Sequence, residues 1–391
     1  MSDSPAPSWV PSFRKKLLPW YAHNRRDLPW RRTTNPYAIW LSEVMLQQTQ
    51  VATVIDYYYR FLQRFPDVQT LADAEEETVL KLWAGLGYYR RARQLHAAAK
   101  MIVNQHGGVF PRDVEGLRGL PGVGRYTAGA IASFAWGLPA PIVEANTLRL
   151  YSRLMALEGD PRGSGAQKKL WTFAESLLPQ QGPNIGRVNQ ATMELGSLVC
   201  LPQQPDCGRC PVTAYCLAHQ QGRQAEIPQQ AKPPLFIPVQ HGLVVIRHRG
   251  RFLMRRNPAG GWWEGLWDFP RVDVSQPRES LAFDPAAPAR QTSRRLVELN
   301  LQRELGLACH AGEHLRTMKH GVTRYRIALF CFKARLVRGE AERLLNGPSM
   351  EWKWVAASSQ HELPLTSTAQ KLWKWLATTN ATTSLPRPAQ R

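Results

Sequence analysis

The sequence predicts two regions of different fold class, a mostly α-helical region followed by an α+β domain. Between Ser8 and His219, apolar residues recur at helical spacing, and Pro and Gly fall in the gaps between the runs. The stretch 226–238 contains four prolines, which is typical of an interdomain linker. Beyond it, short runs of β-branched and aromatic residues indicate strands. We therefore expect a helical region at 8–230, a linker at 231–238, an α+β domain at 239–378 and a disordered tail at 379–391.

Seven helices of the first region follow from periodicity. In each of them apolar residues return every three or four positions, so that one face of the helix can be buried. Breakers such as Pro66, Gly107 and Pro139 lie between the runs. The helices are predicted at 37–59, 78–89, 92–105, 127–136, 148–157, 168–177 and 188–199.

The second region alternates short strand-like runs with one helical run. A helix is predicted at 293–305, and the stretch 277–289 is a poor candidate for regular structure. Strands are predicted at 243–246, 252–254, 267–269, 326–333 and 352–355.

The charge of the chain favours a polyanionic partner. Lys and Arg outnumber Asp and Glu by 50 to 30, which gives a net charge of +20 and a pI near 10.1. Nucleic acid is the usual partner of such a chain, and a solvated basic surface is the alternative. The first ten residues form no apolar signal segment, and no run approaches the ~20 apolar residues of a membrane span. We expect a cytoplasmic, nucleoid-associated monomer that does not bind membranes.

Four cysteines within one short segment predict a metal site. Cys200, Cys207, Cys210 and Cys216 have the spacing C-x6-C-x2-C-x5-C. A [4Fe–4S] cluster takes four Cys ligands from such a segment. Structural zinc is the alternative, although four-cysteine zinc sites usually contain two C-x2-4-C pairs and this segment contains one. The two remaining cysteines lie in the second region without metal-ligand spacing, and we expect Cys309 and Cys331 to be ordinary buried thiols.

A Gly-rich turn between two helical runs predicts a DNA-phosphate site. The turn is the segment LPGVG at 120–124, and glycines there permit a tight hairpin. The second helix then begins near Gly124, and its free N–H groups and positive dipole end suit a phosphate. The alternative is a helical hairpin that serves packing alone. The residues expected at the phosphate site are Gly122, Gly124, Arg125 and Thr127.

These motifs, in this order, resemble the endonuclease III superfamily of helix–hairpin–helix DNA glycosylases. Within it the chain is most similar to the branch that removes adenine, the MutY family. The resemblance is close over about 8–230 and looser beyond. It is carried by LPWR at 28–31, SEVMLQQTQV at 42–51, LWAGLGYY at 82–89, the hairpin, NQ at 189–190 and ELG at 194–196.

The resemblance implies a fold, cofactors and a partner. The helical region is expected to form a six-helix barrel beside a domain that holds a [4Fe–4S] cluster, and the second region is expected to be Nudix-like. A monovalent cation is a further expected ligand of the hairpin. The implied substrate is double-stranded DNA with adenine mispaired with 8-oxoguanine or guanine.

Two carboxylates are expected to carry the reaction. Adenine is a poor leaving group until a ring nitrogen is protonated, and the sugar then develops oxocarbenium character. Glu43 matches the acid of the family, and on a partly apolar helix face its pKa should be raised. Glu144 stands where the family usually has Asp, and it keeps the charge that stabilises the sugar cation. A solvated Glu43 and a Glu144 that only caps a helix are the alternatives.

Two further residues are assigned to the catalytic group by the resemblance. Tyr126 occupies the hairpin position where bifunctional relatives carry a Lys that attacks the sugar. Because a phenol cannot form a Schiff base, we expect a monofunctional glycosylase. Asn146 is expected to orient the catalytic groups.

Base flipping assigns a second set of residues. By family position, the adenine pocket is expected to be lined by Trp30, Arg31, Leu46, Val51 and Gln190. Gln48 and Tyr88 are expected to fill or wedge the DNA stack. Each of these residues has a plain core or surface role as its alternative.

The second region is expected to recognise the lesion without hydrolysing nucleotides. The segment 260–270 resembles the Nudix-like part of the MutY family, but 296–306 has too few carboxylates for a Nudix Mg²⁺ site. The family loop that contacts 8-oxoguanine usually contains Phe-Ser-His, and Val322, Thr323 and Arg324 stand in its place. Thr323 keeps the hydroxyl, and Arg324 is expected to contact either the lesion or a phosphate.

Three other functions compete with adenine removal. A related glycosylase that removes thymine or uracil opposite guanine is compatible with Tyr126. A non-catalytic lesion-binding protein would make Glu43 dispensable. A nucleotide hydrolase centred on the second region is disfavoured by the missing carboxylates.

Overall fold

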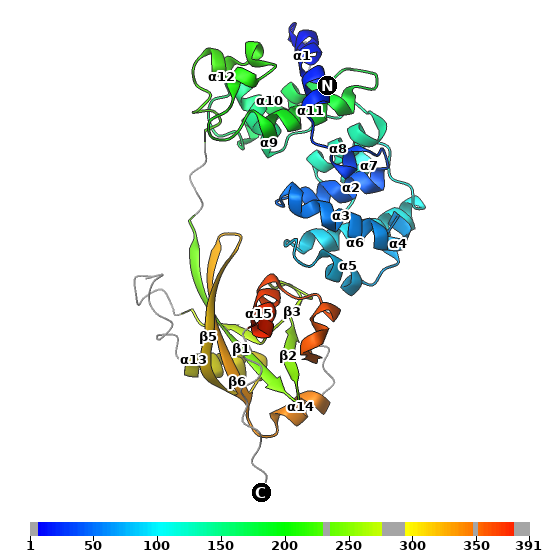
Figure 1. The fold of residues 1–391 in the computed structure, drawn as a ribbon. Coiled ribbons are helices and arrows are strands. Elements are labelled where there is room, and N and C mark those ends of the chain that lie inside the picture. The colour runs from blue at the N-terminus through cyan, green and yellow to red at the C-terminus, as the bar shows by residue number, and fades with distance from the viewer. Residues whose placement is uncertain (1–6, 230–234, 276–293, 347–350, 379–391) are drawn as a thin grey trace. The chain divides into compact units, whose positions relative to one another are not determined.

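The computed structural model describes residues 7–229, 235–275, 294–346 and 351–378. It divides into two compact units (Figure 1). The first contains 1–74 and 90–232, and the second contains 75–89 and 233–391. The segment 75–89 therefore clusters with the C-terminal part of the chain although it lies within the predicted helical region. The predicted tail at 379–391 and the stretch 277–289 lie outside the described residues.

In the described part of the chain, every regular element of the first unit is helical. Its α-helices are α1 (Val10–Asn24), α2 (Pro36–Leu46), α3 (Val51–Arg64), α4 (Val68–Ala72), α6 (Arg90–His106), α7 (Val114–Arg118), α8 (Arg125–Trp136), α9 (Ala145–Leu154), α10 (Ser164–Ser176), α11 (Ile185–Leu198) and α12 (Leu217–Gln220). Three 3-10 turns complete it: η1 (Pro29–Arg31), η2 (Cys207–Arg209) and η3 (Thr213–Tyr215).

One long predicted helix is wrong. The periodicity of 37–59 predicts a single helix, but α2 ends at Leu46 and α3 begins at Val51. The break lies at Gln48, which adopts a left-handed conformation with φ of 57°. Because apolar residues keep helical spacing on both sides of the break, periodicity alone does not reveal it. The helix α1 was absent from the predicted list.

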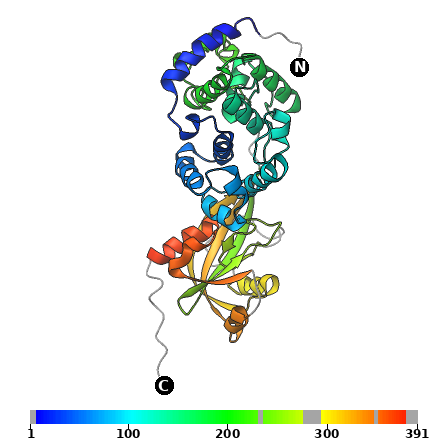
Figure 2. The ribbon, with the colours of Figure 1, turned by 90° about the vertical axis from the view of Figure 1, so that its right-hand side faces the viewer.

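The first unit has a core that joins the start of the chain to later helices. Phe13 and Leu17 of α1 pack with Tyr151 of α9, Leu170 of α10 and Leu195 of α11. In Figure 2 the dark-blue α1 lies beside green helices that are far from it in the sequence. No helix in the described ranges is long and apolar enough to span a bilayer.

The second unit is built on a mixed sheet of the order β3-β2-β1-β6-β5, with β4 paired to β1 and β7 paired to β2. Strands β1 and β6 are parallel, and the other pairs are antiparallel. The strands are β1 (Ile237–His248), β2 (Arg251–Arg256), β3 (Trp267–Asp268), β4 (Arg271–Asp273), β5 (Cys309–Val322), β6 (Tyr325–Leu336) and β7 (Trp352–Ala356). Strand β1 thus begins inside the stretch 231–238, which the sequence predicted as linker, and β5 was not predicted.

Helices cover both faces of this sheet (Figure 1). Because side chains alternate along a strand, Leu243 and Val245 face one core and Val244 and Ile246 face the other. The remaining helices are α5 (Glu76–Trp83), α13 (Arg294–Leu305), α14 (Glu340–Asn346), η4 (Ala357–Glu362) and α15 (Ser367–Thr378). Helix α13 packs in the second core and α15 in the first. Cys309 and Cys331 are free and buried, as predicted.

Candidate active site

The predicted acid lies in the last turn of α2, in the interior of the first unit. Every residue of this helix from Tyr37 to Met45 is buried, and only 4% of Glu43 is exposed. The helix begins with Asn35, whose side chain accepts a hydrogen bond from the Tyr37 N–H. Tyr126 in α8 donates its phenolic hydrogen to Glu43 Oε2 at 2.5 Å. The predicted acid and the predicted hairpin tyrosine therefore touch, although they are 83 positions apart.

Burial gives Glu43 the pKa of a general acid. Desolvation raises the pKa to about 7, the Tyr126 hydrogen bond opposes this shift, and the charge of Glu144 adds to it. Burial and the two carboxylates raise the pKa of Tyr126 well above 10, so the phenol stays a neutral donor. The charge of Glu144 thus raises the pKa of both Glu43 and Tyr126. A carboxyl that holds its proton near neutral pH is suited to general acid catalysis.

Glu144 precedes α9 and caps it. Its Oε1 accepts from the Thr147 N–H at 2.9 Å, and its Oε2 accepts from the Asn146 N–H at 2.9 Å and from Asn146 Nδ2 at 3.2 Å. Burial raises the pKa of Glu144, and these hydrogen bonds oppose the shift. Asn146 thus donates two hydrogen bonds to the Glu144 carboxylate. The cap does not exclude an electrostatic role, because the carboxylate charge also acts on Glu43.

We expect the rate of any reaction that uses Glu43 as an acid to fall above neutral pH. The carboxyl is protonated below its pKa of about 7 and loses its proton as the pH rises through that value. Single-turnover rates should therefore be level on the acid side and fall by about tenfold per pH unit on the alkaline side. A profile that rises from pH 6 to pH 8 would contradict the assignment. Parallel measurements of DNA binding separate this titration from loss of the complex.

An unpredicted carboxylate organises the residues around the expected adenine pocket. Glu194 in α11 is fully buried and pairs with Arg31 at 2.8 Å and with Arg26 at 2.7 Å. Burial alone would raise the pKa of Glu194, but the hydrogen bonds from both arginines hold it at about 2. Arg31 therefore faces a permanent anion. The sequence contained Glu194 in the motif at 194–196, but spacing alone could not pair it with residues 163 and 168 positions away.

The other expected pocket residues lie on η1, α2, α3 and α11. Trp30 in η1 is buried and packs in an edge-to-face arrangement with Tyr58 at a centroid distance of 5.4 Å. Gln190 in α11 accepts a hydrogen bond from the Tyr21 hydroxyl at 2.9 Å. Leu46 ends α2 and Val51 begins α3, and both are half-buried. They flank the break between these helices.

The two expected wedge residues share an unusual backbone conformation. Gln48 has φ of 57° and Tyr88 has φ of 49°, in the left-handed region that ordinary side chains rarely adopt. Both are exposed, and 51% of the Tyr88 side chain is accessible. Such conformations persist only where the surroundings fix them, and they concentrate at functional sites. Gln48 belongs to the first unit and Tyr88 to the second.

The predicted hairpin joins α7 to α8. Gly122 has φ of 76°, and a Cβ there would stand 2.8 Å from the Gln94 Cβ, so two constraints favour glycine. Gly124 caps α8 with open space around it. The Arg125 guanidinium lies 3.9 Å from the centre of the Trp171 ring. Thr127 is buried, and its hydroxyl accepts a hydrogen bond from Gln47 at 3.5 Å, so it lies on the inner side of α8.

The four clustered cysteines lie in the segment between α11 and α12. Burial and the interactions with the other three cysteines raise the pKa of Cys210 to about 12. Arg153 donates to Cys200 Sγ at 3.2 Å, which is a contact that a thiolate ligand would favour. No three His, Cys, Asp or Glu side chains of the described ranges are arranged around a single ion. A [4Fe–4S] cluster takes four Cys thiolates, so the four cysteines of this segment have the residue types that such a cluster needs.

Arg149 connects the cysteine loop to the predicted catalytic residues. Its Nε donates to the Cys200 carbonyl at 2.6 Å, and its Nη2 donates to the Gly196 carbonyl at 2.6 Å and to Asn146 Oδ1 at 3.0 Å. Asn146 in turn holds Glu144. No sequence motif pointed to this arginine, because most of its partners are backbone carbonyls.

We expect Arg149→Gln to lower both metal retention and activity. The variant leaves two buried carbonyls without their charged donor and releases Asn146 from one side. Single-turnover rates should fall by on the order of tenfold, and bound iron per chain should fall with them. Iron content and rate are measured on the same preparation. Arg187→Gln, an exposed change on α11, is the control.

The expected lesion-contacting residues form the tip of the hairpin between β5 and β6. Val322 ends β5, Tyr325 begins β6, and Thr323 and Arg324 are the two-residue turn between them. Thr323 has φ of 48°, as the first residue of a tight turn in such a hairpin requires. Both side chains are exposed at this tip. The Arg324 guanidinium lies 5.5 Å from the centre of the Tyr325 ring.

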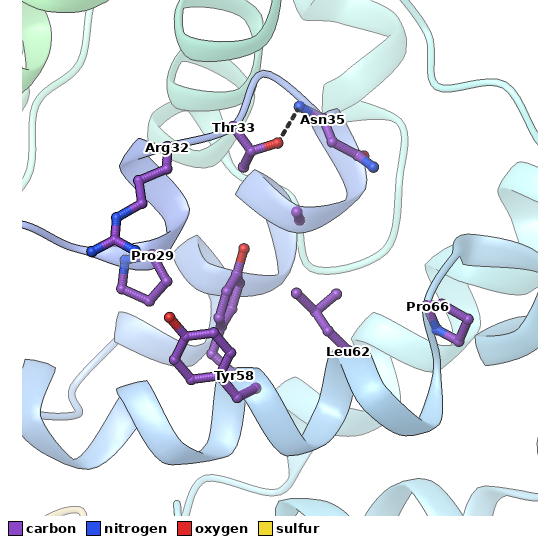
Figure 3. Close-up of a pocket in the computed structure, with 9 residues that line it drawn as sticks. Pro29, Arg32, Thr33, Asn35, Tyr58, Leu62 and Pro66 are labelled. Atoms are coloured by element: carbon purple, nitrogen blue, oxygen red, sulfur yellow. Dashed lines mark hydrogen bonds between the residues drawn. The ribbon is translucent and has the colours of Figure 1, made fainter.

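A cavity of about 440 Å³ lies between η1, α2 and α3 (Figure 3). Figure 3 shows Arg32, Thr33 and Asn35 on one side and Tyr58 with Leu62 on the other. It contains no carboxylate among its lining residues and none of the predicted catalytic side chains. It is therefore separate from the Glu43 site.

Two family models match the chain. Residues 41–176 match the HhH-GPD superfamily of base excision DNA repair proteins, and residues 241–375 match a NUDIX domain. The first match contains Glu43, the hairpin and Glu144, and the second contains the sheet and the β5–β6 turn.

Curated relatives give the family. The human adenine DNA glycosylase is 37% identical over 377 residues, which cover 81% of this chain and 66% of the human protein. The rat adenine DNA glycosylase is 49% identical over 231 residues, which cover 56% of this chain and 44% of the rat protein. The chain thus spans less than two thirds of either relative. The adenine DNA glycosylase of Buchnera aphidicola from Schizaphis graminum is 36% identical over 263 residues, 67% of this chain and 75% of that protein. This chain belongs to the adenine DNA glycosylase family.

Proposed function

We propose that this protein is a monofunctional DNA glycosylase that removes adenine mispaired with 8-oxoguanine or guanine. The observation that carries the proposal is the buried Glu43 carboxyl, which accepts a hydrogen bond from Tyr126 and has a pKa of about 7, raised by burial and by the charge of Glu144. Family membership supports adenine as the base. The active unit is a monomer, and its partner is double-stranded DNA.

The chemistry follows from the protonation states of these groups. Protonated Glu43 donates its hydrogen to a ring nitrogen of the extruded adenine. The bond between the sugar C1′ and the base then breaks, its electron pair leaves with adenine, and the sugar becomes an oxocarbenium ion. The anionic Glu144 stabilises this cation. Water then adds to C1′ and gives a proton to the Glu43 carboxylate, which leaves an abasic site and restores the acid. Tyr126 and Asn146 hold the two carboxylates in place.

Recognition divides between the two units. The hairpin N–H groups and Arg125 bind the DNA backbone, with a monovalent cation held by the hairpin carbonyls. Gln48 and Tyr88 enter the base stack as adenine leaves it. The adenine enters a pocket made of Trp30, Arg31, Leu46, Val51 and Gln190. The turn formed by Thr323 and Arg324 contacts the opposite base.

In the proposed function the cofactor is a [4Fe–4S] cluster, and the residues that would hold it are Cys200, Cys207, Cys210 and Cys216. Bound there, the cluster acts as a rigid cross-link that fixes the loop between α11 and α12. Arg153 and Arg149 join this loop to α9, which begins at Glu144. The protein should therefore be brown when purified without air and should contain iron and sulfide.

Cleavage of defined duplexes tests the proposal. Duplexes with A opposite 8-oxoguanine, A opposite G and T opposite G are incubated with the protein, and the abasic product is cut with alkali. We expect product from the first and second duplexes and none from the third. Release of thymine alone would identify a mismatch glycosylase instead.

Two further outcomes separate the remaining alternatives. Tight binding to every duplex without base release would identify a lesion-binding protein. Covalent trapping in high yield with borohydride would contradict a monofunctional mechanism, because only a Schiff base is trapped. Hydrolysis of free nucleotides with Mg²⁺ would assign an enzymatic role to the second unit.

A further inference from the structure

Arg91 binds the C-terminal end of α2, the helix that carries Glu43, through several hydrogen bonds of a single guanidinium group. It is the second residue of α6, and only 7% of it is exposed. Its Nη1 donates to the Val44 carbonyl at 2.8 Å, the Met45 carbonyl at 3.0 Å and the Gln47 carbonyl. Its Nη2 donates to Thr49 Oγ1 at 3.1 Å. One guanidinium thus binds residues on both sides of Gln48.

These contacts satisfy groups that a helix end leaves open. The last four carbonyls of an α-helix have no partner within the helix, and those of Val44 and Met45 belong to this set in α2. A cation at the negative end of the helix dipole is also favourable. The Val44 carbonyl directly follows Glu43 in the chain. Arg91 therefore fixes the turn of helix that carries the acid.

The same contacts enclose a strained residue. Gln48 lies in the left-handed region, where a side chain with a Cβ is disfavoured. Arg91 holds the carbonyl before it and the hydroxyl after it, and the Thr49 N–H donates back to the Leu46 carbonyl at 3.3 Å. A conformation of this kind persists only when its neighbours determine it. Arg91 is a charged neighbour that binds the residues on both sides of Gln48 in this conformation.

We propose that Arg91 is a positioning residue that sets Gln48 at a fixed place relative to Glu43. This inference rests on the proposed function, in which Gln48 enters the base stack and Glu43 protonates the extruded adenine. Arg91 itself contacts neither base. By joining the two through one side chain, it couples extrusion of the base to the position of the acid.

A double-mutant cycle with the full-length protein tests the coupling. Arg91→Lys keeps the charge but replaces the planar fork of donors with a single ammonium group. Gln48→Gly removes the side chain and tolerates the left-handed conformation. Single-turnover adenine release is measured with A opposite 8-oxoguanine. Extrusion is followed by the fluorescence of 2-aminopurine placed at the adenine position, which rises on unstacking.

We expect Arg91→Lys to lower adenine release and the fluorescence rise by on the order of tenfold in the otherwise unchanged protein. In the Gln48→Gly background the same substitution should change either quantity by less than about threefold. Equal losses in both backgrounds would overturn the proposal. Thr49→Val, which removes the 3.1 Å contact with Arg91 and the 3.4 Å bond from the Thr49 hydroxyl to the Gln47 carbonyl, should lower both quantities in the same direction and serves if Arg91→Lys does not fold.

A readout without DNA keeps this test separate from that of the proposed function. Backbone amides at 48 and 49 should exchange hydrogen at least about tenfold faster in Arg91→Lys than in the unchanged protein. Lys100→Met, an exposed change on the same helix, should leave exchange and rate unaltered. Unchanged exchange at 48 and 49 in Arg91→Lys would refute the positioning role. If the unchanged protein releases no adenine, the proposed function fails while the exchange result still stands.

Discussion

Glu43→Gln should abolish adenine release while DNA binding persists. The amide has nearly the same size as the carboxyl but cannot deliver a proton to the base. Because a positioned acid contributes roughly 10²–10⁴-fold, single-turnover rates should fall by that factor. The Tyr126 hydroxyl can still donate to the amide oxygen, so the contact at 2.5 Å has a substitute and the fold should be retained.

The control for Glu43→Gln is the same substitution at an exposed helical glutamate. Glu342→Gln lies on α14 of the second unit and should leave the rate unchanged. Binding is measured with a duplex that carries an uncleavable adenine analogue opposite 8-oxoguanine. Near-normal turnover by Glu43→Gln would show that Glu43 is not the general acid. Loss of both binding and thermal stability would instead indicate a structural defect.

The sequence-based predictions of the site rest on continuous motifs. Glu43, the hairpin and the cysteine segment are each defined by neighbouring residues, and the contact of Tyr126 with Glu43 agrees with their joint assignment. Helix periodicity located most of the helices, because each buries one face. Fold class and family were therefore accessible from the sequence.

The parts that the sequence missed depend on distant partners or on backbone conformation. The pairing of Glu194 with Arg26 and Arg31 joins residues more than 160 positions apart. The break at Gln48 depends on a left-handed residue that periodicity cannot register.

Strand β5 was missed because it is polar and irregular. Only Cys309 and Met318 are buried in its fourteen residues, and its register with β6 shifts near His314. A strand with so few buried positions gives no apolar alternation to recognise. Its long pairing with β6 is what stabilises it.

Glu144→Gln should separate the charge of this side chain from its role as a helix cap. The Gln oxygen can still accept a hydrogen bond from the Thr147 N–H, so α9 keeps a cap and the melting temperature should change little. The negative charge beside the sugar is lost. Since removing one group that stabilises developing charge typically costs roughly 10²–10³-fold in rate, we expect a loss of that size at neutral pH.

Glu144→Ser completes the argument, because Ser is among the best N-cap residues and carries no charge. If capping were the whole role of Glu144, the Ser variant would retain both stability and adenine release. If the charge stabilises the oxocarbenium ion, Ser and Gln should lose activity alike while remaining folded. Glu144→Asp, which restores a shorter carboxylate and a good cap, should then retain more activity than either, because it alone keeps an anion beside the sugar. An Asp variant as inactive as Gln would mean that the longer side chain, and not its charge alone, sets the geometry at this position.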